Sequence, residues 1–181
     1  EIPSGLLDGA YEEGGELDLY AEFAANYIVR RDPSGRWCKW NGTGYVNPLA
    51  GVNDAVKVIK EAPNGDIYIG GNFTSAGGVD GTYKIARWSK ANQVWEGLGV
   101  SGSGDEGITC MAFDANGDLY IGGYFHYFAG TSGANYFAKY NVSGGTWSAV
   151  GTGIDNTVNA IEISPDGTIY IGGVFTSIGG N

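Results

Sequence analysis

The chain has 181 residues, of which 33 are glycine and 12 are tyrosine, and its formal net charge is −10 at pH 7. Glycine and aromatic residues are poor helix formers, and aromatic residues suit the half-buried positions of strands, so the composition argues against a helical protein. With 10 basic residues against 20 acidic ones, the chain cannot assemble a basic face, which argues against nucleic-acid binding.

Neither a membrane span nor a secretion signal is recognisable. No apolar run approaches the length needed to cross a bilayer, and the chain begins with Glu1 instead of methionine. We therefore expect a mature product, a trimmed product or a piece of a longer chain. The two cysteines, Cys38 and Cys110, stand at non-equivalent places in the repeat described below and are interpreted as two free thiols or one disulfide.

Residues 1–26 carry only a faint version of the repeat. Residues 15–23 (GELDLYAEF) contain a glycine, two alternating leucines and a terminal phenylalanine at the spacing found later between Gly65 and Phe73, but they lack a Gly-Gly pair. We interpret residues 1–26 as a lead-in, a linker or a degenerate blade, and residues 27–181 as the repeat region.

Two long segments, residues 55–99 and 108–151, follow one scheme of four short strands. Each begins with an apolar run and continues through a Gly-Gly strand. A third strand follows, at residues 83–88 in the first segment and 136–140 in the second. The fourth strand is short and contains one tryptophan. Four antiparallel strands in about fifty residues are the period of a kelch-like blade, so we predict an all-β protein with the β-propeller fold.

Partial units flank these two segments. Residues 37–40 and 45–49 are predicted to be third and fourth strands, and residues 158–173 are predicted to be the first two strands of a further blade. About three blades cannot close a propeller, which typically has four to eight. We therefore expect either that the chain continues beyond Asn181 or that identical chains complete the ring, and we favour the longer chain.

An eleven-residue motif marks the second strand of each unit. It is YIGGNFTSAGG at residues 68–78, YIGGYFHYFAG at 120–130 and YIGGVFTSIGG at 170–180. An Asn-Gly or Asp-Gly pair precedes each copy, which is a strong hairpin signal. The Gly-Gly pair allows another strand to approach closely, and the following phenylalanine is expected to return to the core. These repeated residues are interpreted as structural.

The motif, followed by the IARW strand and the VNAI-like strand, resembles the kelch-like propeller repeats of tailed-bacteriophage tail proteins and of secreted bacterial surface proteins. The resemblance covers residues 27–181 and implies the fold more than an activity, because propellers carry many unrelated functions. Residues 27–45 are also similar to the segment that joins such phage propellers to a tail-attached region.

Catalytic chemistry is not evident in the sequence. The single histidine, His126, excludes a repeated Ser-His-Asp arrangement and leaves too few nitrogen ligands for a zinc or copper site. We therefore expect no enzyme activity, no catalytic residues and no cofactor. Asp114, Asn116 and Asp118 have the alternation of a calcium loop, but the closing glutamate is absent, and hairpin-turn residues explain them better.

The clearest departures from the repeat lie in the second blade, where Tyr124, His126 and Tyr127 replace residues such as Asn72 and Thr74. Aromatic side chains with polar tips favour interfaces and can stack on a sugar ring, so these three are candidate ligand-binding or partner-binding residues. The alternative is that they pack against a neighbouring segment, and we weigh it slightly ahead.

The loop at residues 101–107 is longer than its counterpart in the next blade and adds Asp105 and Glu106 as further candidates. A less favoured enzymatic reading would use the carboxylates of Asp80, Asp105 and Glu106 at the centre of the propeller.

These features lead to two hypotheses. The first is a non-enzymatic propeller of a phage tail tip or fibre, which serves in assembly or host-surface contact. The second is a secreted bacterial carbohydrate-binding or adhesion propeller. Both place the protein on a virion or outside the cell, with virion proteins, surface proteins or a cell-surface glycan as partners.

Overall fold

The computed structural model describes residues 52–100, 107–126 and 128–179 in full and residues 29–31, 37–40 and 45–46 as backbone strands. The chain divides into two compact units, Glu1–Asn47 and Pro48–Asn181. The candidates Asp105, Glu106 and Tyr127 lie outside the described residues, as does the whole of the segment 1–26.

The first unit contains one antiparallel sheet with the strand order β1-β2-β3. Its strands are β1 (Val29–Arg31), β2 (Trp37–Trp40) and β3 (Tyr45–Val46). Two of them, β2 and β3, occupy strands predicted from the sequence. Trp40 is opposite Tyr45 in the β2–β3 register, just as Trp88 is opposite Trp95 and Tyr140 is opposite Trp147 in the second unit. This shared register relates the first sheet to the repeat.

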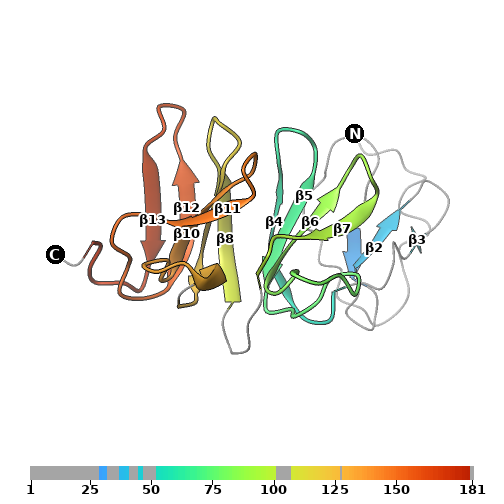
Figure 1. Ribbon diagram of the computed structural model, residues 1–181, viewed down its shortest axis with the longest axis horizontal. Coiled ribbons are helices and arrows are strands. Elements are labelled where there is room, and N and C mark those ends of the chain that lie inside the picture. The colour runs from blue at the N-terminus through green and yellow to red at the C-terminus, as the bar shows by residue number, and fades with distance from the viewer. Residues whose placement is uncertain are drawn as a thin grey trace, which may run out of the picture. The chain divides into compact units, whose positions relative to one another are not determined.

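The second unit consists of three antiparallel sheets, which stand in a row in Figure 1. Blade one has the order β4-β5-β6-β7, with strands Val56–Glu61, Ile67–Gly71, Ile85–Ser89 and Val94–Gly97. Blade two contains β8 to β11, at Gly107–Phe113, Leu119–Tyr124, Phe137–Asn141 and Thr146–Ala149, and the 3₁₀ turn η1 at Phe128–Gly130. Blade three contains β12 (Val158–Ile163) and β13 (Ile169–Gly173).

The predicted hairpin between the first two strands is present in each blade. The turn glycines Gly65, Gly117 and Gly167 have φ values of 83°, 81° and 86°, a left-handed conformation in which a side chain is strained. The register also shifts once in each hairpin, between Val56 and Val58, Ile108 and Cys110, and Val158 and Ala160. The same bulge in all three pairs confirms that the repeat is structural.

Successive blades pack face to face through the Gly-Gly strand of one and the first strand of the next. A Cβ atom added at Gly70 would lie 2.5 Å from Met111 Cε and 2.8 Å from Ile108 Cγ2, and one at Gly122 would lie 2.7 Å from Val158 Cγ1. The interior strand glycines therefore make room for the neighbouring blade, as the motif predicted.

The core lies between the sheets. Tyr68, Phe73, Ile108, Ile121 and Phe125 are fully buried, which confirms that the repeated aromatic residues of the first two blades are structural. Within the described ranges, the structure contains no helix whose length and apolar character would let it cross a bilayer.

Candidate functional site

Three aromatic side chains from two segments of blade two meet at one place, which we call the aromatic cluster (Tyr124, His126 and Tyr136). Tyr124 is the last residue of β9, and Tyr136 immediately precedes β10. The His126 and Tyr136 rings lie 4.7 Å apart between centroids, and Tyr124 lies 5.9 Å from His126 and 6.0 Å from Tyr136. The Tyr136 hydroxyl and His126 Nε2 form a hydrogen bond of 3.0 Å.

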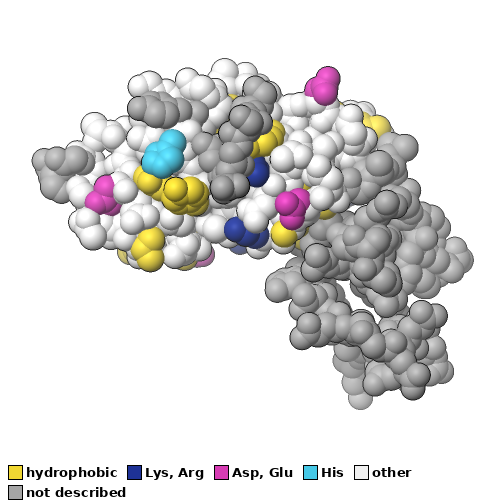
Figure 2. Space-filling model, turned by 90° about the horizontal axis from the view of Figure 1, so that it is seen from below, with side chains coloured by type: hydrophobic (Ala, Val, Ile, Leu, Met, Phe, Trp, Pro, Cys, Tyr) yellow, Lys and Arg dark blue, Asp and Glu magenta, His cyan; other side chains and the backbone are white. Residues whose placement is uncertain are grey.

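One ring of the cluster is buried, and the other two are exposed to solvent. Tyr136 is only 8% exposed, whereas Tyr124 is 49% exposed and His126 is also exposed. Figure 2 shows the chain's one histidine at the surface beside hydrophobic side chains. Burial raises the pKa of the Tyr136 hydroxyl above its usual value, so this group stays protonated at neutral pH. The arrangement offers a supported aromatic surface with a hydroxyl and an imidazole at its edge.

The backbone beneath the cluster is the same as in blade one. Tyr136 and Lys84 have φ values of 62° and 63°, and their amides donate 2.9 Å hydrogen bonds to the carbonyls of Phe125 and Phe73. In blade one, the ammonium of Lys84 instead donates to the carbonyl of Asn72 at 2.8 Å. Since blade one folds the same way without these aromatic side chains, the fold itself does not require them.

Tyr136 was missing from the sequence-based candidates. The alignment of residues 83–88 with 136–140 placed Tyr83 opposite Tyr136 and so concealed the departure from the repeat. The pairings Ile85↔Gly70 and Phe137↔Gly122 show that Lys84 is the equivalent of Tyr136. Aligning the third strand on its alternating apolar residues would have found it.

The other departures from the repeat and the remaining candidates fall into three groups. Phe128, which also departs from the repeat, is buried and lies 4.8 Å from the Phe125 ring and 4.9 Å from the Trp147 ring, so it belongs to the core. Asp80, from the enzymatic reading, is exposed. Tyr127, Asp105 and Glu106 lie outside the described residues, and their assignment stays a prediction.

The position of Asp105 in the repeat is nevertheless informative. Counted from the first strand, it corresponds to Asn53 in blade one and Asp155 in blade three. Asn53 Oδ1 accepts hydrogen bonds from the amides of Thr74 and Ser75, and Asp155 Oδ1 accepts them from the amides of Thr176 and Ser177, at 2.9 to 3.1 Å. In blades one and three, the side chain at this position therefore holds the loop that follows the Gly-Gly strand.

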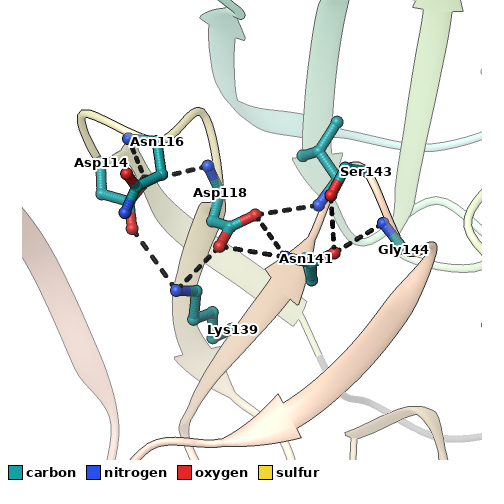
Figure 3. A network of polar contacts seen from close by, with 8 residues as sticks. Asp114, Asn116, Asp118, Lys139, Asn141, Ser143 and Gly144 are labelled. Atoms are coloured by element: carbon teal, nitrogen blue, oxygen red, sulfur yellow. Dashed lines mark hydrogen bonds and ion pairs between the residues drawn. The ribbon is translucent and has the colours of Figure 1, made fainter.

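The calcium candidates lie in the polar network of Figure 3, at the β8–β9 turn. Asp114 Oδ1 accepts the amides of Asn116 and Asp118, both at 2.9 Å, which is the bonding of a turn residue. The ammonium of Lys139 lies 2.9 Å from Asp118 Oδ2 and 3.4 Å from Asp114 Oδ2. The cation between these two carboxylates is therefore a lysine of the third strand.

Asp118 also joins this turn to the next one. Its carboxylate accepts hydrogen bonds from Asn141 Nδ2 at 3.0 Å and from the Val142 amide at 3.1 Å. The hydrogen bond from Lys139 is the largest of the effects that hold the Asp118 pKa below its usual value. Among the described residues, no group of three or more His, Cys, Asp and Glu side chains could hold a metal ion.

Blade one contains a counterpart of this network that sequence reasoning overlooked. Asp66 Oδ1 accepts the Lys90 amide at 2.9 Å, and Arg87, at the position of Lys139, lies 3.9 Å from Asp66 and forms an ion pair with Glu96. The sequence contained a pattern that predicts these ion pairs. In both blades, an aspartate follows the turn glycine, and the third strand carries a basic residue.

Comparisons with known proteins agree with the observed architecture. The family model "Domain of unknown function (DUF5122) beta-propeller" matches residues 164–181. No curated protein matches the sequence.

Two crystal structures similar to the chain are the WD40 β-propeller domain of Doa1 and the extracellular domain of BT4673 from B. thetaiotaomicron. The first has a TM-score of 0.55 and 15% identity, covering 84% of this chain and 45% of that chain. The second has a TM-score of 0.53 and 12% identity, covering 84% of this chain and 20% of that chain. At these identities the likeness concerns the fold, which is an all-β propeller. The chain spans less than half the length of either structure.

Proposed function

We propose that the chain is a non-enzymatic binding module, a kelch-like propeller of a phage tail tip or fibre that serves in assembly or in contact with the host surface. The observation that carries the binding role is the aromatic cluster, whose three side chains come from two segments of blade two and all depart from blade one at equivalent backbone positions. The phage assignment depends on the resemblance of the repeats.

The chemistry of the cluster suits a binding surface. Two tyrosines and a histidine combine apolar ring faces with polar tips, and such residues are enriched where proteins bind partners. The rings of His126 and Tyr136 lie 5.9 Å and 6.0 Å from the Tyr124 ring and limit its movement on that side. A ligand that stacks on Tyr124 would therefore meet a partly preorganised surface, which reduces the entropy lost on binding.

The contacts of the ionisable side chains in blade two support the non-enzymatic part of the proposal. The one histidine hydrogen-bonds with a buried tyrosine, and the carboxylates of Asp114 and Asp118 contact Lys139. These groups stabilise turns and rings by contacts within blade two.

A second candidate function is a secreted bacterial carbohydrate-binding propeller. The exposed Tyr124 ring favours it, because the apolar face of a sugar stacks on an aromatic ring while its hydroxyls bond to neighbouring polar tips. One structural neighbour is the extracellular domain of a bacterial protein, which agrees with a position outside the cell.

The experiment is a binding measurement on the 181-residue chain with two probes, an array of bacterial surface glycans and the tail proteins of a candidate phage. The double variant Tyr124→Ser/His126→Ser removes the exposed rings, and the matched control Asn72→Ser/Thr74→Ser changes the equivalent positions of blade one. If the chain binds a glycan and only the first variant loses that binding, glycan recognition by the cluster is supported, whether the chain is a phage or a bacterial propeller. If the chain binds a tail protein and no glycan on the array, a role in assembly is supported. Binding that survives the first variant would refute the role of the cluster.

A further inference from the structure

Lys84 is a buried lysine that forms no ion pair with any carboxylate of the described residues. It is 4% exposed and immediately precedes β6. Its ammonium donates a hydrogen bond of 2.8 Å to the carbonyl oxygen of Asn72 and lies 4.8 Å from the centre of the Tyr83 ring. An ammonium has three donors, and a lysine is almost never this buried unless a charged partner compensates the lost hydration. The Lys84 ammonium therefore has donors and charge that these neighbours do not use.

A second ammonium group lies beside the same asparagine. A Cβ atom added at Gly107, the first residue of β8, would lie 2.5 Å from Asn72 Oδ1 and 3.6 Å from Lys57 Nζ. Lys57 belongs to β4 and is exposed, and it also forms no ion pair within the described part of the chain. We call Lys57 and Lys84 the lysine pair. Two positive charges thus lie at the junction of blades one and two.

Two basic residues of the third strands show how this chain usually places a buried cation. Arg87 forms an ion pair with Glu96, and the ammonium of Lys139 lies 2.9 Å from Asp118 and 3.4 Å from Asp114. Acidic residues outnumber basic ones by 20 to 10, so carboxylates are abundant. Leaving the lysine pair without one costs stability through desolvation and mutual repulsion. Arrangements that break a stability rule in this way are expected mainly at functional sites.

The fold does not require these lysines, because blade two has uncharged residues at both positions. The register makes Thr109 the equivalent of Lys57 and Tyr136 the equivalent of Lys84. The hydroxyl of Thr109 donates a hydrogen bond of 2.7 Å to the carbonyl of Val158. The same backbone thus forms with a threonine and a tyrosine, and the charges are a property of blade one alone.

We propose that the lysine pair binds an oxyanionic group, the carboxylate or phosphate of an acidic ligand. The oxyanion accepts hydrogen bonds from both ammonium groups and neutralises their charge. Such charge-assisted hydrogen bonds are about twice as strong as neutral ones, and they gain further strength where water is partly excluded. A lysine binds either group as a point charge, so the chemistry is shared and the test includes both. This inference does not depend on the aromatic cluster or on its ligand.

The test is calorimetric titration of the 181-residue chain at low ionic strength with three probes, inorganic phosphate, glucuronate and glucose. Glucuronate and glucose share a sugar ring and differ in the carboxylate, so their comparison isolates the contribution of the charge. We expect saturable binding of phosphate, of glucuronate or of both, and much weaker binding of glucose. The probe that binds identifies the group. Added sodium chloride should weaken the binding, because salt screens the attraction.

Three variants locate the site. Lys84→Met and Lys57→Met remove one ammonium each while keeping most of the apolar side chain, and each should raise the Kd by about tenfold or more. The control Lys90→Met removes the same charge at an exposed position beyond the other end of β6, and it should change the Kd by less than about twofold. Thermal melting establishes that each variant is folded, and the exposed Lys57 provides the test if Lys84→Met does not fold.

Three results would overturn the proposal. The first is that phosphate does not bind and glucuronate binds no more tightly than glucose. The second is an affinity that Lys90→Met lowers as much as the other two variants, because this would indicate attraction to overall charge. The third is an affinity that neither Lys84→Met nor Lys57→Met lowers.

Discussion

The indole nitrogen of Trp147 in β11 donates a hydrogen bond of 2.9 Å to the carbonyl oxygen of Leu98, which follows β7 in the preceding blade. This bond ties the outer strand of blade two to blade one, while the Gly-Gly strand and β8 join the same blades elsewhere. Trp95, the equivalent residue of blade one, has a buried indole nitrogen without a hydrogen-bond partner among the described residues.

Because of this difference, the same tryptophan-to-phenylalanine substitution should lower stability by different amounts in the two blades. Trp147→Phe and Trp95→Phe remove the same volume, but only the first removes a hydrogen bond, so it should be more destabilising by about 1 kcal/mol. Urea unfolding of both variants provides the comparison. Equal losses would mean that the bond between the blades contributes nothing to stability.

Asp118→Ala should lower the free energy of unfolding by about 2 kcal/mol, because it removes the nearer carboxylate partner of the Lys139 ammonium and the acceptor of two partly buried hydrogen-bond donors. Asn116→Ala, at an exposed position of the same turn, should change it by less than about 0.5 kcal/mol. Calcium should not raise the Tm of the wild-type chain, because the ammonium lies between the carboxylates. A calcium-dependent rise that Asp118→Ala abolishes would instead establish a metal site.

The acid limb of the stability curve should depend on Asp118 and Glu96. Their pKa values are lowered in the folded state, each chiefly by the hydrogen bond from its basic partner, Lys139 or Arg87. A lowered folded-state pKa contributes stability above the unfolded pKa of about 4, and this stability is lost as the pH falls through the folded value. Unfolding followed between neutral pH and pH 2 should therefore show a loss below about pH 4 that is shallower in Asp118→Asn.

Gly122→Ala and Gly172→Ala form a matched pair that tests the packing of the blades. The added methyl group would lie 2.6 Å from Cys110 Sγ and 2.7 Å from Val158 Cγ1 at Gly122, but 3.9 Å from its nearest neighbour at Gly172. Gly122→Ala should destabilise the fold by about 1–3 kcal/mol and Gly172→Ala by much less. Chemical unfolding would measure both, and similar losses would contradict the packing argument.

Cys110 should be unreactive in the folded chain. Burial raises the pKa of its thiol to about 11, so at pH 8 it is neither ionised nor accessible. In a Cys38→Ser background, a disulfide-exchange reagent should label it slowly under native conditions and rapidly in denaturant. Fast native labelling would show that β8 and β12 separate easily.

How much the sequence revealed is best judged from particular residues. The hairpin glycines Gly65, Gly117 and Gly167 were predictable because an Asn-Gly or Asp-Gly turn between apolar runs is a local signal. The burial of Phe73 and Phe125 followed from their repetition. Tyr136 was missed because its role depends on a one-residue register between β9 and β10, which a local alignment does not fix.

The sequence alone determined the repeat, the strands and their antiparallel pairing, because alternation and turn residues act over a few positions of one chain. Only the tertiary structure decided what these residues contact. It brought Tyr124, His126 and Tyr136 together across a loop, directed the Lys139 ammonium between Asp114 and Asp118, and left Tyr170 exposed where Tyr68 is buried. Such contacts join residues distant in sequence, and their partners are selected by the packing of sheets, to which no local pattern corresponds.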